Sequence, residues 1–378
     1  MEIYLDHSAT TPCSSEAVEA CRGAMADCYG NPSSLHRKGF AAERLTDAAR
    51  ESIAAALACD GTELIFTSGA TEANNLALIG AARARERRGK TIVISAVEHP
   101  SVLEPAAWLE KQGFTVKRIF PGADGVYSPA DFAEAMDQET VLVSAMMVNN
   151  ETGLILPVLE IAKAVKRMSN DVLFHTDAVQ GFLKQPIRLK NSMIDLLSVS
   201  GHKVRAPKGV GALYIRKGVR LLPLLYGGGQ QNGLRPGTEP VPLIAAFGAA
   251  VEAQKGRIAE NAAHYETLRS HLVGCLSGIS GVEARTGGEY APWIVSVSAY
   301  GLRSEILLHY LEEAEIYVSS GSACSKGAPS HVLSALGIDR RTADETIRVS
   351  MSAATTVAEL DAFAERLAEA MRLLHKQR

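Results

Sequence analysis

Features typical of secreted, membrane and nucleic-acid-binding proteins are missing from this sequence. No apolar run among its 378 residues reaches the roughly 20 residues needed to cross a bilayer. The opening stretch, MEIYLDHSATTP, has no basic segment followed by an apolar one, so we expect no secretion signal. The net charge of −3 gives no general attraction to nucleic acid. We therefore expect a cytoplasmic protein with no membrane partner and no direct nucleic-acid partner.

Cysteine is scarce and scattered. The six cysteines lack the paired spacing of a disulfide framework, and the first three match no zinc-binding pattern. They are Cys13, Cys21, Cys28, Cys59, Cys275 and Cys324. This usage favours a reducing cytosol over a secreted, disulfide-stapled scaffold, and it gives no reason to expect a metal.

The remaining composition is that of an ordinary globular chain, long enough for a large core and two domains. Short apolar runs predict strands at 63–67, 91–96, 116–120, 141–148, 172–177, 194–200 and 211–216. Helical patterns lie between many of them, for example at 70–88, 101–112, 128–137 and 157–168. Strands that are apolar on both faces and alternate with helices predict an α/β fold with a mostly parallel seven-stranded sheet between helices.

The pattern changes near residue 250. A long helical stretch is expected over about 243–278, followed by shorter strands and helices and a final amphipathic helix at 357–375. This pattern predicts a second, smaller α+β domain. Just before the change, YGGGQQNGLRPGTEP (226–240) mixes glycines with Arg235, Thr238 and Glu239, which is typical of an ordered functional loop rather than a linker.

One lysine follows a predicted buried strand. Lys203, in SGHK, comes directly after the apolar run 194–200, and ligands of open α/β sheets bind beyond strand ends. In a partly desolvated pocket a lysine has a lowered pKa and becomes an amine nucleophile. It can then form a Schiff base with a carbonyl, as lysines do with pyridoxal phosphate. The alternative is an ordinary solvated lysine.

A pyridoxal cofactor would make further demands that other strand ends can meet. Its phosphate needs N–H groups at a helix start, and FTSGATEANNLAL (66–78) supplies them, although a plain helix cap is an equal alternative. Its pyridinium nitrogen needs a carboxylate, which Asp177 could supply, with Gln180 within reach of the ring oxygen. His99 could stack on the ring and carry protons. Turn chemistry and a structural histidine are the competing interpretations.

Three more segments carry candidate side chains. Asn149 and Asn150, in VNNETG, could hold a cofactor oxygen or a substrate carboxylate, or could simply shape a turn. Arg348, in TIRVS, could bind a carboxylate in bidentate fashion or form a structural salt bridge. Cys324 lies in a small-residue loop, SSGSACSKGAP, where it is either an accessible thiolate nucleophile or a chance surface cysteine.

Together these segments resemble the cysteine desulfurases, pyridoxal-phosphate enzymes of the class V aminotransferase group. The matching segments run in order from residue 4 to about residue 350: YLDHSATTP, GNPSSLH, FTSGATEANN, EHPSVL, VNNETG, HTDAVQ, SVSGHKVRAPKGVGALY, GGGQQNGLRPGTE, SSGSAC and IRVS. The resemblance implies a fold-type I enzyme with a large PLP-binding domain over 13–255. A small α+β domain, 1–12 and 256–378, would carry the catalytic cysteine loop.

The resemblance also implies how pyridoxal 5'-phosphate would be held. The implied cofactor-binding residues are Ala70, Thr71, His99, Asn150, Asp177, Gln180, Ser200, His202, Lys203 and Thr238. Lys203 would form the Schiff base, and Asp177 would pair with the pyridine nitrogen. The residues implied at the phosphate are Ala70, Thr71, Ser200 and His202. Thr238 would reach the phosphate of the neighbouring subunit, which implies a homodimer with composite sites.

The implied reaction converts L-cysteine to L-alanine. Lys203 and His99 would move the Cα proton, Asn150 and Arg348 would orient the substrate carboxylate, and the Cys324 thiolate would take the sulfur as a persulfide. An iron–sulfur scaffold or a thiolation enzyme would then accept that sulfur. A selenocysteine lyase or a class V aminotransferase with the same cofactor is one alternative. A non-catalytic scaffold is another, which the joint presence of these residues disfavours.

Overall fold

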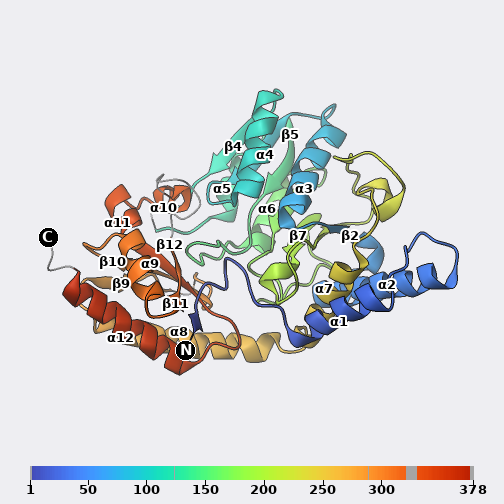
Figure 1. Ribbon diagram of the computed structural model, residues 1–378. Coiled ribbons are helices and arrows are strands. Elements are labelled where there is room, and N and C mark those ends of the chain that lie inside the picture. The colour runs from blue at the N-terminus through green and yellow to red at the C-terminus, as the bar shows by residue number, and fades with distance from the viewer. Residues whose placement is uncertain (1, 123, 288, 321–329, 375–378) are drawn as a thin grey trace.

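The computed structural model describes residues 2–122, 124–287, 289–320 and 330–374. Its centre is a seven-stranded sheet, which confirms the predicted α/β fold (Figure 1). The strands lie in the order β2-β8-β7-β6-β5-β3-β4. Their bounds are β2 (Leu64–Thr67), β3 (Thr91–Ser95), β4 (Thr115–Ile119), β5 (Thr140–Ser144), β6 (Leu173–Asp177), β7 (Leu196–Ser200) and β8 (Gly211–Ile215). Each of the seven predicted strands corresponds to one of them.

The sheet is parallel except for β8, which runs antiparallel to both of its neighbours, β2 and β7. The other adjacent pairs are parallel. Parallel strands need crossover connections, and their helices bury both faces of the sheet. Every residue of β3, β5, β6 and β7 is accordingly buried. This burial explains the continuous apolar runs in the sequence.

Helices cover both faces of the sheet (Figure 1). Successive strand residues point to opposite sides, so Ile92 and Ile94 pack in the core with α3 and α4, whereas Val93 packs in the core with α2, α6 and α7. The helices of this unit are α1 (Ser15–Ala26), α2 (Arg37–Leu57), α3 (Ala70–Arg85), α4 (Pro100–Lys111), α5 (Pro129–Glu134), α6 (Val158–Met168) and α7 (Val241–Gln254). The helical patterns identified α3 to α6, and they did not identify α1 and α2.

A smaller α+β unit, orange and red in Figure 1, follows α7. One of its sheets has the order β12-β13-β10-β9, and a second joins β1 to β11. These strands are β1 (Ile3–Tyr4), β9 (Val282–Ala284), β10 (Ile294–Ala299), β11 (Ile316–Tyr317), β12 (Ser319–Ser320) and β13 (Thr346–Ser350). The helices are α8 (Ile258–Ser277), α9 (Ser304–Glu312), α10 (His331–Ala335), α11 (Arg340–Asp344) and α12 (Val357–Leu373). The domain boundaries at residues 12 and 255 stay a prediction.

The expected single helical stretch over 243–278 is wrong in one respect. The helix breaks between α7 and α8, at 255–257. The reason is packing, because α7 lies against α1 and α2 in the large unit whereas α8 lies against α12 in the small one. In the described part of the chain, no helix combines the length and apolar character needed to cross a membrane.

The glycine-rich stretch 226–240 is anchored to the sheet, as expected of an ordered loop. It contains the short 3-10 helix η3 (Gln230–Gly233). The side chain of Gln231 is buried, and its Oε1 accepts a hydrogen bond of 2.8 Å from the Phe66 backbone N–H at strand β2. Arg235 forms an ion pair of 3.0 Å with Glu72 in the first turn of α3. The loop is therefore fixed beside the start of that helix.

Candidate active site

Lys203 lies just beyond the carboxyl end of β7, in the 3-10 helix η2 (Gly201–Lys203). Its Nζ donates a hydrogen bond of 2.8 Å to the carbonyl oxygen of Ala9 and another to that of Ser8. Nε2 of Gln180 donates to the same Ser8 oxygen at 3.0 Å. Two side chains that follow different strands therefore meet at one backbone carbonyl of the N-terminal segment.

The N-terminal segment also fixes the backbone around Lys203. Thr11 donates from its backbone nitrogen and from Oγ1 to the carbonyl oxygen of His202, at 2.9 and 2.8 Å. The backbone N–H of Arg205 donates to Thr11 Oγ1 at 2.9 Å. Residues 8–11 thus form one wall of the site, a role that the sequence patterns did not predict.

A directed hydrogen-bond chain connects Asp177 to His99. Asn74 Nδ2 donates to Asp177 Oδ2 at 2.7 Å and to Ser101 Oγ at 2.8 Å. Ser101 Oγ lies 2.8 Å from His99 Nδ1, and the backbone N–H of Ser101 donates to the same nitrogen at 3.1 Å. Because Nδ1 accepts that N–H, it carries no proton, and the Ser101 hydroxyl donates to it as well. The chain therefore runs through α3 and α4 from a strand-end carboxylate to an imidazole.

These contacts determine the protonation state of His99. Burial lowers the pKa of His99; the Asp177 charge opposes this effect, and Lys203 and His331 add to it. The ring is therefore neutral, with its proton on Nε2. A neutral imidazole of this tautomer offers an N–H donor at Nε2 instead of a positive charge. The hydrogen-bond chain through Asn74 and Ser101 places His99 and Asp177 in one environment.

The register of three strands brings the proposed phosphate-binding segments to one edge of the sheet. Gly211 of β8 lies opposite Thr67 of β2 on one side and opposite Ser200 of β7 on the other. A Cβ at Gly211 would lie 2.8 Å from the Cα of Gly69, so only glycine allows this approach. The start of α3 and the end of β7 consequently face the same space.

The donors at this edge suit an anion. Helix α3 begins at Ala70, and the first N–H groups of a helix have no partner within it. Ala70 is half-buried and Thr71 is exposed, so both are accessible to a ligand. His202 Nδ1 lies 3.3 Å from Thr10 Oγ1, and burial, with Lys203 and Lys208, lowers the pKa of His202 to about 4. His202 is therefore a neutral hydrogen-bonding group at neutral pH.

Arg348 and Asn150 lie together at the junction with the small unit. The Arg348 side chain is buried in β13; its Nη2 lies 2.7 Å from Asp6 Oδ1, and Nη1 donates to the carbonyl oxygen of Asn150 at 2.8 Å. A structural salt bridge, which was one of the two interpretations of Arg348 from the sequence, is therefore present. Asn149, by contrast, shapes the turn, because its Oδ1 accepts from the backbone N–H groups of Glu151 and Thr152.

One predicted site residue is not brought into this group. Thr238 is exposed on the 226–240 loop, and among the described residues it makes no side-chain hydrogen bond to the others. Cys324 lies outside the described residues, in the gap 321–329.

Sequence reasoning missed Asn74, Ser101, Ser8 and Asp6. Asn74 had a detectable signal, because it is a polar residue within the apolar face of α3 that also carries Ala73 and Ala77, and a buried polar side chain needs a hydrogen-bond partner. Ser8 and Asp6 had none, since their partners are distant in the sequence, whereas Ser101 stands only two residues after His99 at the start of α4.

A hollow of about 540 Å³ adjoins the site between α3 and α4. Its lining joins Thr71, at the proposed phosphate edge, to His99 and Ser101. Trp108 lies at the far side of the hollow and is 42% exposed, which is unusual for so large an apolar side chain. The site is therefore open to the molecular surface next to His99.

Known proteins share this arrangement over nearly the whole chain. The family model for aminotransferase class-V matches residues 3–363. The cysteine desulfurase IscS of Methanosarcina thermophila is 40% identical over 377 residues, which cover 98% of this chain and 92% of the relative. The chain belongs to the cysteine desulfurases of the class-V aminotransferase family. A putative cysteine desulfurase of this family from Bacillus subtilis is 38% identical over 378 residues and is covered to 99%.

Two solved structures agree with this membership. A NifS-like protein superposes with a TM-score of 0.93 at 38% identity, covering 98% of this chain and 100% of its own. SspA, solved in complex with cysteine, gives a TM-score of 0.81 at 34% identity and covers 93% of this chain and 99% of its own. The family's fold therefore extends over both units of the protein.

Proposed function

We propose that this protein is a PLP-dependent cysteine desulfurase. It removes the sulfur of L-cysteine, releases L-alanine and keeps the sulfur as a persulfide on Cys324. The observation that carries the proposal is the meeting of an amine, a carboxylate and a neutral imidazole, Lys203, Asp177 and His99, at the ends of parallel strands. Membership of the cysteine desulfurase family and the similarity to a cysteine-bound SspA structure support the choice of substrate.

Pyridoxal 5'-phosphate fits the residues that are present. Buried Gln180 Oε1 is an acceptor with no hydrogen-bond partner among the described residues, and a hydroxyl group on the ring could donate to it. Lys203 would hold the aldehyde carbon, Asp177 the ring nitrogen, and His99 the ring face. The phosphate would be bound by the edge that includes Ala70, Thr71, Ser200 and His202. When bound, this group supplies an electron-withdrawing ring that makes the substrate Cα proton acidic.

The chain's own residues would then move protons and hold the substrate. The Ser8 and Ala9 carbonyls orient the Lys203 amine, which takes the Cα proton of cysteine and returns a proton to the product. His99 offers its Nε2 proton to the reacting groups. Asp6 and the Asn150 carbonyl hold the Arg348 guanidinium, whose buried Nε has no partner among the described residues. That arginine and the Asn150 amide would bind the cysteine carboxylate.

Sulfur transfer needs no oxidant or reductant besides L-cysteine and the Cys324 thiolate. The Cys324 thiolate attacks the sulfur of the substrate, the Cβ–S bond of cysteine breaks, and a new S–S bond forms. Cβ takes a proton and becomes the methyl group of alanine, and Cys324 keeps the sulfur as a persulfide. A protein thiolate, such as that of an iron–sulfur scaffold or a thiolation enzyme, would accept this sulfur in turn.

We also propose a homodimer in which Thr238 of the partner subunit reaches the phosphate. The exposed position of Thr238 on a loop fixed beside α3 supports this role. Large exposed apolar side chains also support a dimer surface: Tyr29, Leu35 and Phe40 before and within α2, and Leu225 and Tyr226 around the start of the loop. The five described cysteines are free, which supports a reducing compartment such as the cytoplasm.

Peptide mapping after reaction with L-cysteine tests the sulfur transfer. Mass spectrometry should find the added sulfur on Cys324, with one alanine formed per cysteine consumed. Cys59 is an internal control, because burial, Glu63 and Asp60 raise its pKa to about 12 and keep its thiol protonated. Cys324→Ser should bind the cofactor and stop releasing alanine. A keto acid product would identify an aminotransferase instead, and sulfur on another cysteine would disprove the role of Cys324.

Borohydride reduction of the holoenzyme tests the cofactor site. The reduced pyridoxyl group should map to the peptide that contains Lys203, and Lys203→Ala should leave no covalently attached group. Attachment to a different lysine would contradict the proposed site.

A further inference from the structure

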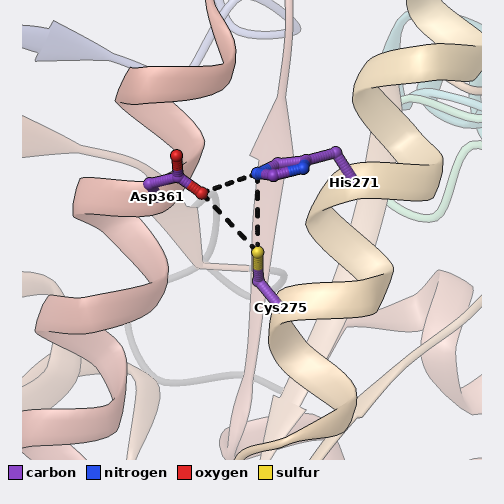
Figure 2. Close-up of side chains that lie close together, drawn as sticks. All are labelled: His271, Cys275 and Asp361. Atoms are coloured by element: carbon purple, nitrogen blue, oxygen red, sulfur yellow. Dashed lines mark hydrogen bonds and ion pairs between the residues drawn. The ribbon is translucent and has the colours of Figure 1, made fainter.

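A second cluster of reactive side chains lies on the small unit, between α8 and α12 (Figure 2). His271 and Cys275 stand one helical turn apart on α8, and Asp361 faces them from α12. The side chains of His271 and Asp361 are 34% and 48% exposed, so solvent reaches the cluster. In the described part of the chain, no hydrogen bond or ion pair joins these three side chains to the active-site residues above.

The three side chains converge at one point. His271 Nε2 lies 2.6 Å from Asp361 Oδ1, Cys275 Sγ lies 3.5 Å from the same nitrogen, and Sγ lies 3.7 Å from Oδ1 (Figure 2). Each residue therefore directs one nitrogen, sulfur or oxygen atom toward the other two.

These separations are close to those of a zinc coordination shell. Tetrahedral Zn²⁺ bonds of about 2.3 Å to sulfur, about 2.05 Å to nitrogen and about 2.1 Å to oxygen place the ligand atoms about 3.6 Å (N···S), about 3.6 Å (S···O) and about 3.4 Å (N···O) apart. The two distances that involve Cys275 already match. The His271–Asp361 pair would open by less than about 1 Å, which side-chain rotation of two half-exposed residues allows.

We propose that His271, Cys275 and Asp361 bind one Zn²⁺ ion and so link α8 to α12. A thiolate with an imidazole selects zinc over Mg²⁺ or Ca²⁺, which prefer oxygen ligands, and water would fill the fourth position. Binding releases the thiol proton, because the thiolate is the metal ligand. The ion would join the start of the last helix to the helix that opens the small unit, and so would stabilise that unit.

Cobalt is the optical probe for this site, since Co²⁺ occupies zinc sites and gives visible absorption when bound by thiolate. The holoenzyme titrated with Co²⁺ should develop these bands in a metal-minus-metal-free difference spectrum, saturating at one equivalent, and Zn²⁺ should then remove them. Cys275→Ser should abolish the thiolate band, and His271→Ala and Asp361→Asn should weaken binding at least tenfold. None of these three should lose desulfurase activity, which verifies folding.

Cys59→Ser and Cys324→Ser are the matched controls, because each removes one thiol elsewhere in the chain. Both should keep the cobalt bands. As a second measurement, Zn²⁺ should raise the melting temperature of the wild type by a few degrees and leave that of Cys275→Ser unchanged. Absence of binding in the wild type would overturn the proposal. So would bands that survive in Cys275→Ser, or bands that are lost in Cys324→Ser.

Discussion

Ser101→Ala breaks the hydrogen-bond chain between Asp177 and His99 at its central link. It removes the hydroxyl that donates to His99 Nδ1 at 2.8 Å and accepts from Asn74 Nδ2. The backbone N–H of residue 101 still donates to Nδ1, so the ring keeps one partner and its place as the N-cap of α4. The change is therefore selective, because it weakens the preference for an unprotonated Nδ1 without removing the imidazole.

The size of the effect follows from one hydrogen bond. The lost donor stabilised the neutral form of His99 by about 1 kcal/mol, which corresponds to an increase of about 0.7 in the pKa of His99. Asn74 is fully buried, and it would lose an acceptor for one of its N–H groups. We expect this unsatisfied donor to lower the free energy of unfolding by about 1–3 kcal/mol.

The pH dependence of kcat/KM for alanine release measures the first effect, because its acidic limb reports ionisation in the free enzyme. If neutral His99 is required, Ser101→Ala should shift this limb to higher pH by about 0.7 units. Ser144→Ala is the matched control: its hydroxyl lies 2.8 Å from the Nδ1 of a different histidine, His175, and both residues are buried. That variant should lose similar stability without moving the limb. An unmoved limb in Ser101→Ala, or equal shifts in both variants, would refute the reasoning.

Three further substitutions test other charges. Burial, with Lys203, lowers the pKa of Lys184 in the folded protein to about 7. The unfolded chain therefore binds this proton more tightly than the folded protein does, so the free energy of unfolding rises with pH from about 7 to the pKa of the unfolded lysine. Lys184→Met should have a higher free energy of unfolding than wild type at pH 7, by at most about 5 kcal/mol, and this difference should fade toward pH 10; a difference that does not depend on pH would contradict the reasoning. Burial raises the pKa of Glu98 to about 8, so the free energy of unfolding of the wild type should fall as pH rises from about 4.5 toward 8. Denaturant unfolding of Glu98→Gln should show a weaker fall over this range. Parallel pH dependences in the two proteins would exclude the raised pKa of Glu98. Arg348→Lys should raise KM for L-cysteine about tenfold or more with a smaller change in kcat; an unchanged KM would remove Arg348 from the carboxylate site.

The strands and the strand-end residues could be predicted because their signals are local. A parallel sheet buries both faces, so each strand is a short apolar run, and a polar residue directly after it must lie at the edge. Lys203 and Asp177 were found in this way, and both lie at the carboxyl ends of their strands. The break between α7 and α8 was not found, since it depends on which neighbours each helix packs against.

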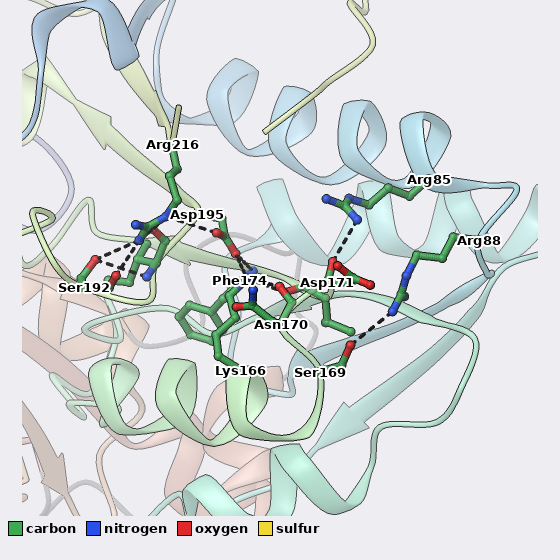
Figure 3. A network of polar contacts seen from close by, with 12 residues as sticks. Arg85, Arg88, Lys166, Ser169, Asn170, Asp171, Phe174, Ser192, Asp195 and Arg216 are labelled. Carbon is green, nitrogen blue, oxygen red and sulfur yellow. Dashed lines mark hydrogen bonds and ion pairs between the residues drawn. The ribbon is translucent and has the colours of Figure 1, made fainter. Parts of the chain in front are cut away.

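Long-range polar partners could not be predicted from local patterns. Asp195 lies at the start of an apolar run, which suggested only a buried strand. In the structure its carboxylate forms ion pairs with Lys166 of α6 at 2.6 Å and with Arg216 after β8 at 3.3 Å, and it accepts a hydrogen bond of 2.8 Å from the backbone N–H of Phe174 (Figure 3). A buried charge requires such partners, yet the requirement does not say which cations supply them. The same limit applied to Arg348, whose partner Asp6 lies at the other end of the chain.

The candidate site depends both on local sequence patterns and on long-range packing, and the two control different properties of the site. The position of the site is set by the strand register, which puts Ser200 and Thr67 on either side of Gly211. Local sequence patterns specify this register. The proton position on His99 is set locally, because the backbone N–H of Ser101 donates to Nδ1 at the N-cap of α4. The packing of α3 against α4 adds Asn74, which joins Ser101 Oγ to Asp177 Oδ2. Two chains could therefore share every strand-end motif and still differ in whether a buried carboxylate is connected to this imidazole. It follows that the acid–base properties of the site depend on buried helix contacts outside the recognisable catalytic residues.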